Sequence, residues 1–155
     1  MKLIVDRMLG KLAKLLRIIG FDTLYSNNID FEELLCVADK EERIILTRNT
    51  LIKKQERAYK FFFIHDNDPI RQLEEVINGL DLKIEYMGVL TRCIGCNKTL
   101  VKISKEEADG RVPDYIFKTH IDFSFCKNCN KVYWKGTHYE KMLERLEEFG
   151  KHTKD

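Results

Sequence analysis

Residues 2–20, KLIVDRMLGKLAKLLRIIG, join a short apolar run to an amphipathic segment, and this stretch decides the fold class. The run Leu3–Val5 is typical of a buried strand, and it ends at Asp6. Over 8–19 the apolar residues recur at helical spacing, and Gly20 is placed to end the helix. A buried strand followed at once by a helix favours an α/β fold with a parallel sheet.

The same alternation continues to about residue 80. Short apolar runs predict strands, and amphipathic runs predict helices. The strand predicted at 43–47 is expected to lie in the centre of the sheet. In chain order we expect a strand at 23–25, a helix after Asp30, a strand at 43–47, a short helix at 51–58, a strand at 61–64 and a helix after Asp68. Asp30 has Glu33 three residues on, as in a capping box, and Asp68 precedes a proline at the first helical position.

The pattern changes between 82 and 90, where helical periodicity stops and hairpin-like segments begin. We therefore expect two domains, an α/β domain over 1–87 and a smaller unit over 88–150. The second unit consists of a zinc ribbon, from about 91 to 136, and a final helix. Glycine and proline mark a turn inside the ribbon at 110–113.

The final helix begins at residues 137–140, whose sequence fits another capping box. Its apolar residues fall on one face and are Met142, Leu143, Leu146 and Phe149. This face is expected to pack back on the first domain or to pair with another copy of the chain, as in a homodimer.

Four of the five cysteines form two pairs with the same spacing. The pairs are Cys93-Ile-Gly-Cys96 and Cys126-Lys-Asn-Cys129, with 29 residues between them. Two such turns bring four thiolates to the corners of a tetrahedron, which is the geometry of a structural Zn²⁺ site. Structural disulfides are rare in the cytosol, and a redox pair is expected singly, at the start of a helix. The fifth, Cys36, falls in a predicted amphipathic helix and is most simply a small buried residue.

The composition limits the function classes: the chain has 155 residues, 44% hydrophobic and 34% charged. It contains no run of about 18 apolar residues, and its first residues do not resemble a signal peptide, so we expect a cytoplasmic protein with no membrane partner. Residues 1–20 carry five basic groups and one acid, and residues 88–139 carry nine basic groups and five acids. Residues 21–49, by contrast, carry three basic groups and seven acids. The two basic segments suit a polyanion, and they also fit an ordinary solvated surface.

Acidic and polar residues follow the predicted strands, at the edge where an open parallel sheet binds ligands. They are Asp6 after the first strand, Thr47-Arg48-Asn49 after the central one, Asp66 and Asp68 after the last one, and Asp30 and Glu33 at the second helix. Several carboxylates at one edge suit Mg²⁺ or Mn²⁺, and such an ion activates water for attack on a phosphodiester. Helix capping is the competing explanation for Asp30 and Asp68, whereas Asp6 ends a strand with no helix to cap.

Several motifs resemble the Mut-seven C-terminal RNase domain family. They are DRMLGKLA at 6–13, LRIIGFDT at 16–23, RIILTR at 43–48, Arg92-Cys93 with Cys96-Asn97, and VYWKGTHY at 132–139. Together they extend the resemblance over nearly the whole chain, to about Leu146. It implies a PIN-like three-layer α/β domain with a carboxyl-terminal zinc ribbon, and a metal-dependent ribonuclease activity.

The resemblance also implies site residues. The acids of the PIN pattern fall on Asp6, on Asp30 or Glu33, and on Asp66 or Asp68. The family usually has Thr-Arg-Asp where this chain has Thr47-Arg48-Asn49, so an amide replaces a metal-binding carboxylate. Because an amide supplies no charge, we expect weaker Mg²⁺ binding. A natural weakening, a loss of catalysis and an engineered substitution all remain open.

Contacts to the substrate are predicted at three cations. Arg17 and Arg48 are candidate phosphate contacts, with salt-bridge partners as the alternative. Lys135 lies in sequence among Tyr133, Trp134 and Tyr139, which either stack on unpaired bases or pack the ribbon against the last helix. His120 and His138 are not needed by a site that already has four thiolates, and His65, which follows a buried strand, is expected to make a local hydrogen bond.

The expected function is hydrolysis of RNA, in single-stranded regions, by a site that holds Mg²⁺ or Mn²⁺, with Zn²⁺ as a structural ion. The alternative is a catalytically silent nucleic-acid-binding or adaptor module, for which Asn49 is the main argument. A third possibility is a toxin-like ribonuclease that a protein partner holds inactive.

Overall fold

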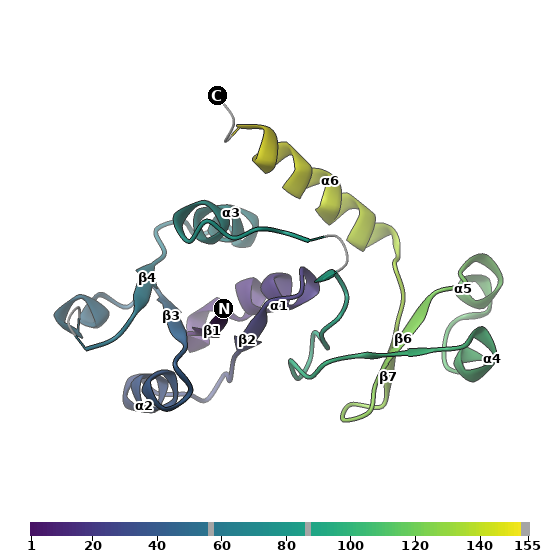
Figure 1. The fold of residues 1–155 in the computed structure, drawn as a ribbon, viewed down its shortest axis with the longest axis horizontal. Helices are drawn as coiled ribbons and strands as arrows, with labels where there is room; N and C mark the ends of the chain where they lie inside the picture. The colour runs from purple at the N-terminus through teal and green to yellow at the C-terminus, as the bar shows by residue number, and fades with distance from the viewer. Residues whose placement is uncertain (56–57, 86–87, 153–155) are drawn as a thin grey trace.

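The computed structural model describes residues 1–55, 58–85 and 88–152, and for 149–152 the backbone alone. Within these ranges the chain forms two sheets, one parallel and one antiparallel, with helices around them (Figure 1). The predicted apolar position of Phe149 lies outside the described side chains.

The first sheet has four parallel strands in the order β2-β1-β3-β4. They are β1 (Lys2–Val5), β2 (Asp22–Leu24), β3 (Ile44–Thr47) and β4 (Phe61–Phe63). All four predicted strands are therefore present, and β3 lies inside the sheet between β1 and β4, as the sequence indicated.

Helices cover both faces of this sheet (Figure 1). On one face lie α1 (Gly10–Ile18) and α3 (Pro69–Gly79), and on the other lies α2 (Phe31–Glu41). The strand residues alternate between the two cores: Leu3 and Val5 belong to the α1–α3 side, and Ile4 belongs to the α2 side. The fold is thus the expected three-layer α/β arrangement.

The helix ends follow the predicted signals, with two differences. Asp30 and Glu33 form a capping box at α2, and the Asp68 carboxylate accepts hydrogen bonds at the start of α3. A 3₁₀ turn, η1 (Arg7–Leu9), precedes α1. A second 3₁₀ segment, η2 (Thr50–Gln55), covers the first part of the helix predicted at 51–58, of which residues 56 and 57 lie outside the described ranges. Gly20 has φ 98° after α1, and a Cβ there would lie 2.2 Å from the Gly88 carbonyl oxygen, so only glycine fits.

The second sheet is antiparallel and contains β5 (Val101–Ile103), β6 (Phe123–Cys126) and β7 (Lys131–Tyr133). Two short helices, α4 (Lys105–Ala108) and α5 (Asp114–Thr119), stand between β5 and β6, on either side of the predicted turn. These helices were not predicted, because one and a half turns give too little periodicity to detect. Together with the cysteine-bearing loops they form the ribbon, residues 91–136.

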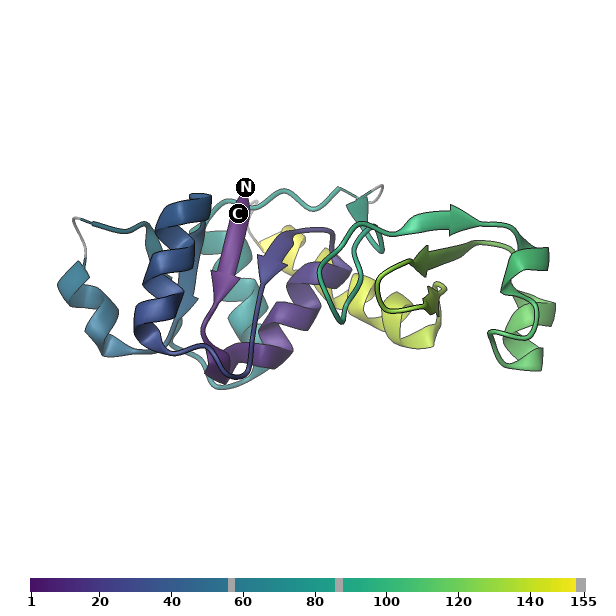
Figure 2. The same ribbon diagram turned by 90° about the horizontal axis from the view of Figure 1, so that it is seen from below.

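The last helix, α6 (Thr137–His152), leaves the ribbon and returns to the first sheet (Figure 1). Met142 and Leu146 join the core that α1 and α3 form on the sheet, so the predicted packing on the first domain is confirmed. The molecule is elongated, with the first sheet at one end and α4 and α5 at the other (Figure 2). No helix in the described ranges has the length and apolar character needed to cross a membrane.

Candidate metal centre and acidic pocket

Four cysteines meet at the base of the ribbon. The sulfurs of Cys93, Cys96, Cys126 and Cys129 all lie within 4.8 Å of one another. The Sγ atoms of Cys93 and Cys129 are 3.8 Å apart, and those of Cys96 and Cys126 are 3.5 Å apart. A tetrahedral zinc ion with bonds of about 2.3 Å separates its sulfurs by about 3.8 Å, so this cysteine cluster fits Zn²⁺.

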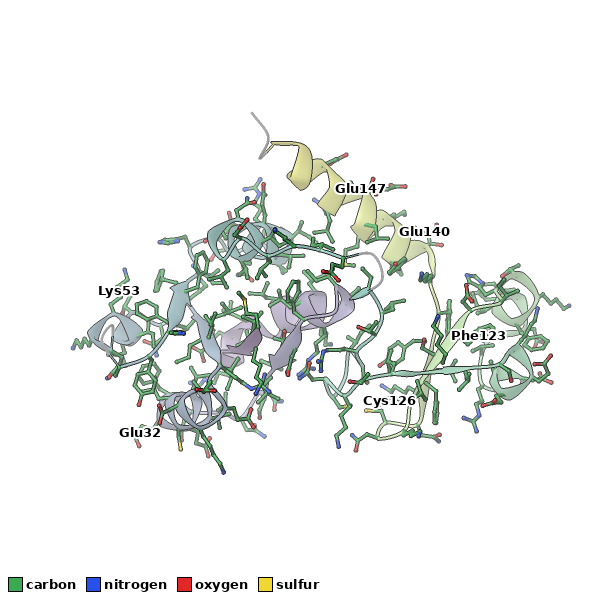
Figure 3. The ribbon with its side chains drawn as sticks, viewed as in Figure 1. Glu32, Lys53, Phe123, Cys126, Glu140 and Glu147 are labelled. Atoms are coloured by element: carbon green, nitrogen blue, oxygen red, sulfur yellow. The ribbon has the colours of Figure 1, made fainter. Side chains whose placement is uncertain are left out.

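The two cysteine loops share one backbone geometry. Each second cysteine is followed by an asparagine with left-handed backbone, at φ 70° for Asn97 and 56° for Asn130. The amide of Asn97 donates to the Cys93 carbonyl at 2.9 Å, and that of Asn130 donates to the Cys126 carbonyl at 2.8 Å. Asparagine tolerates this conformation well, which explains its repetition after both pairs. Cys126 ends β6 on the side toward the first sheet, and Phe123 begins it toward α4 and α5 (Figure 3).

Hydrogen bonding favours a thiolate at Cys93. Burial by itself would raise the pKa of this thiol, but the Tyr133 hydroxyl, 3.1 Å from the sulfur, and the backbone amides of Cys96 and Gly95 lower that pKa to about 6. The pKa of Cys129 is raised, because its contact with Cys96 favours the neutral thiol. A divalent cation would let all four groups ionise together, which is how zinc binding releases protons.

The first cysteine loop is fixed to the first sheet by Arg17 of α1. Its Nε donates to the Thr23 carbonyl at 2.9 Å, and its Nη1 donates to the Ile94 carbonyl, between the two cysteines, at 2.8 Å. Arg17 is only 4% exposed. The prediction that it contacts phosphate is therefore wrong, because its guanidinium is buried against the backbone of two elements.

A pocket of about 520 Å³ lies at the carboxyl ends of β1 and β3, where the sequence predicts a binding site. It is lined by Asp6, Asp30, Arg48 and Asn49 among others, and we call it the acidic pocket. Asp6 and Asp30 are far apart in sequence, and the topology brings them to one edge because β1 is central while α2 begins at the same side.

Both oxygens of Asp6 are held by hydrogen bonds. Oδ1 accepts from the Arg7 amide at 2.7 Å, and Oδ2 accepts from the hydroxyl of buried Thr47 at 2.7 Å. Asp6 therefore caps η1, which corrects the expectation that it had no helix to cap. The cap does not compete with metal binding, since each carboxylate oxygen keeps a second lone pair.

Asn49 is held by its backbone and its side chain. Its amide donates to the Thr47 hydroxyl at 2.9 Å, and its Oδ1 accepts from the Leu51 amide at 3.0 Å. Thr47 thus links Asn49 to Asp6 through one hydroxyl. An aspartate at position 49 would accept the same bond and add a negative charge to the acidic pocket.

The other predicted acids lie outside the described lining of the acidic pocket. Glu33 accepts from the Asp30 amide in the capping box, and Asp68 caps α3. Asp66 accepts from the Asp68 amide at 2.8 Å and faces Arg71 at 3.9 Å. These contacts are local, so the structure gives all three a role in the loops and helix ends.

Two amides that the sequence did not suggest line the acidic pocket instead, Asn67 and Gln72. Gln72 is 5% exposed and donates to the Asp66 carbonyl at 2.9 Å. Asn67 accepts from Arg48 Nη1, which places that exposed guanidinium at the pocket. Gln72 could have been found from the sequence, because it is a polar residue on the buried face of a predicted helix. No sequence feature pointed to Asn67.

The remaining candidates are also placed. Lys135 is exposed, with Nζ 5.8 Å from the centre of the Tyr139 ring. Tyr133 and Trp134 contribute to the ribbon, the first at the cysteine cluster and the second against its core. Cys36 is exposed on α2, so the expectation of a buried residue is wrong.

Metal-binding side chains gather closely at one place in the described ranges. The four clustered cysteines are the one group there in which three or more Cys, His, Asp or Glu side chains lie close enough to bind the same ion.

The fold and the two sites define a class: a parallel α/β domain with an acidic pocket, joined to a four-cysteine metal-binding ribbon. The chain belongs to the Mut7-C RNAse domain family, whose model matches residues 1–146. This match confirms the resemblance that the sequence motifs carry, and it suggests ribonuclease-like function. Neither a curated protein nor a solved structure matches the sequence significantly.

Proposed function

We propose that the chain is a ribonuclease that depends on a divalent metal ion and hydrolyses RNA phosphodiester bonds in the acidic pocket. The observation that carries this proposal is the meeting of Asp6, Asp30 and Arg48 in one pocket at the carboxyl edge of the first sheet. Membership of an RNase domain family supports RNA as the substrate.

The residues of the acidic pocket fit a hard cation, with a low ligand charge. Asp6 and Asp30 supply two carboxylates, and the side-chain carbonyl of Asn49 supplies a neutral oxygen, which are ligand types that Mg²⁺ and Mn²⁺ accept. When bound there, the ion would lower the pKa of a water ligand and stabilise charge on the phosphoryl group. With two negative charges in place of three, the site should hold the ion weakly.

Other residues of the chain would bind the substrate, position the Asp6 carboxylate and hold the structural ion. Arg48 is exposed at the pocket and suited to bind a phosphate oxygen through its guanidinium fork. Thr47 fixes the Asp6 carboxylate through its hydroxyl and is a positioning residue. The cysteine cluster would bind Zn²⁺ as a structural ion that holds the ribbon together.

The test is cleavage of a labelled single-stranded RNA by the zinc-loaded chain with added Mg²⁺ or Mn²⁺. Asp6→Asn and Asp30→Asn are expected to abolish cleavage with the fold intact, whereas Asp66→Asn should retain it, because Asp66 lies outside the described lining. Circular dichroism and zinc content are the controls for folding. Cleavage that persists in both Asp6→Asn and Asp30→Asn contradicts the proposal.

A second candidate function is a silent RNA-binding or adaptor module, which the neutral amide of Asn49 favours. It predicts RNA binding without cleavage by the native chain.

A homodimer and a cytoplasmic location stay predictions. Light scattering of the chain in solution tests whether it forms a homodimer.

A further inference from the structure

A groove of about 930 Å³ lies between the ribbon, α1 and α6, separate from the acidic pocket. It borders the cysteine cluster, because Ile94 and Tyr133 are among its lining residues. Its apolar floor includes Leu15 and Ile18 of α1 and Met142 of α6. Its rim is different in character, because it carries aromatic rings and basic groups. We call it the stacking groove.

Two tyrosines offer rings to the stacking groove. Tyr115 of α5 is 68% exposed, although the ribbon core beside it is built from Ala108, Ile116 and Phe123. Tyr139 of α6 is half-buried, with Lys135 Nζ 5.8 Å from its ring centre. A large exposed ring on a small module is available to stack on a flat ligand, and a nucleobase has a π-face of that kind.

The charge of the stacking groove complements a polyanion. Lys135, Lys141 and Arg145 are exposed and line it, against the single acid Glu140 among the described lining residues. Lys141 and Arg145 are four residues apart on α6, so two like charges share one helix face and repel each other. A bound phosphate between them would relieve this repulsion.

We propose that the stacking groove binds a single-stranded segment of RNA, with bases on Tyr115 and Tyr139 and phosphates on Lys141 and Arg145. The carboxyl end of β1, where the acidic pocket lies, and the first turn of α6 are on the same side of the molecule (Figure 2). The choice of RNA among polyanions rests on the proposed function, whereas the location of the groove does not.

The test measures the affinity of the full, zinc-loaded chain for fluorescent single-stranded RNA, without added Mg²⁺ or Mn²⁺. Tyr115→Ala should weaken binding of a long oligonucleotide about tenfold, whereas Tyr115→Phe, which keeps the ring, should not. Lys141→Ala and Arg145→Ala should each lower the slope of log Kd against log salt by about 0.7. Lys118→Ala is the matched control, since Lys118 is exposed on α5 but outside the described lining.

The outcomes separate this proposal from the proposed function. Loss of affinity in the groove variants supports the groove even if the chain never cuts RNA, in which case the catalytic proposal alone fails. Unchanged affinity in Tyr115→Ala, Lys141→Ala and Arg145→Ala overturns the groove while cleavage that depends on Asp6 still stands. If Tyr115→Ala changes the molecular mass of the protein in solution but leaves its RNA affinity unaltered, a second copy of the chain occupies the groove. That result would also overturn the proposal.

Discussion

Asn97 of the first cysteine loop donates a hydrogen bond of 2.7 Å from Nδ2 to Oδ1 of Asp22, at the start of β2. Its Oδ1 accepts from the Thr23 amide at 2.9 Å, so one buried side chain makes two bonds to the edge strand. Asp22 also pairs with Arg43 at 2.7 Å, just before β3. The cysteine cluster is thereby attached at the amino ends of the strands, opposite the carboxyl ends where the acidic pocket lies.

Replacing Asn97 by glycine should destabilise the protein. Asn97→Gly keeps the left-handed backbone but removes both bonds to β2, which should cost about 1–3 kcal/mol. Chemical denaturation measures this cost. Asn130→Gly changes the equivalent position of the other loop, which is exposed, and should cost less than about 0.5 kcal/mol. Equal effects in the two variants would contradict the role assigned to Asn97.

Stability should depend on Asp22 in the acid range. Burial alone would raise the pKa of this carboxyl, but hydrogen bonds from Arg43 and Asn97 lower it below its ordinary value of 3.8. A lowered pKa stabilises the fold at neutral pH, and this contribution disappears as the pH falls through the folded pKa. Asp22→Asn should therefore unfold more easily than wild type at pH 7, with the difference shrinking below pH 3.8. A difference that is constant with pH would refute this.

Loss of one cluster cysteine should remove the metal ion and loosen the ribbon. Cys93→Ser should contain less than one zinc per chain and melt at a lower temperature, because the ribbon core has only three buried apolar residues apart from the cysteines. Metal analysis and calorimetry measure both. Cys36→Ser, at an exposed cysteine outside the cluster, should keep its zinc and its melting temperature.

Placing a carboxylate at position 49 should strengthen metal binding in the acidic pocket. Asn49→Asp adds a third negative charge where the Leu51 amide already orients the side chain, so the Mg²⁺ needed for half-maximal RNA cleavage should fall roughly tenfold. Addition of Asp6→Asn to this variant should abolish the gain. If Asn49→Asp leaves the Mg²⁺ titration unchanged, position 49 is not a ligand.

Removing the Thr47 hydroxyl should disturb Asp6 without changing the substrate contacts. Thr47→Val leaves Asp6 Oδ2 and the Asn49 amide without their partner, at a cost of about 1–3 kcal/mol in stability, and it should also weaken Mg²⁺ binding. Thr47→Ser keeps the hydroxyl and should behave nearly as wild type in the metal titration. A purely structural role would lower stability in Thr47→Val but leave the metal midpoint in place.

The sequence predicted the strands and the caps at Asp30 and Asp68, because each depends on residues close together in the chain. It predicted the four-cysteine cluster because two distant pairs repeat the same spacing, which is typical of a zinc site. It did not predict that Asp6 caps a 3₁₀ turn, since three residues give no helical period. It also offered Arg17 as a phosphate contact, although the arginine reaches the backbone of two segments that only the tertiary fold brings together. Contacts of this kind are set by packing, which no local pattern reveals.

The acidic pocket was predicted in outline. Parallel strands place their ends at one edge, so Asp6 and Asn49 meet for a reason that the sequence supplies. Which acids of the β4–α3 connection reach the pocket depends on loop conformation, and the amides Asn67 and Gln72 line it where Asp66 and Asp68 were expected.

The return of α6 to the first sheet has a consequence for how the chain is made. Met142 and Leu146 complete the same core as Leu12 and Leu73, yet the whole ribbon lies between these segments in sequence. During synthesis the apolar face of α1 and α3 that α6 covers therefore stays exposed until the ribbon and then α6 have been made. A metal ion held by Cys93 and Cys129 would close this connection into a loop, which shortens the effective chain between α3 and α6 and favours the return of α6.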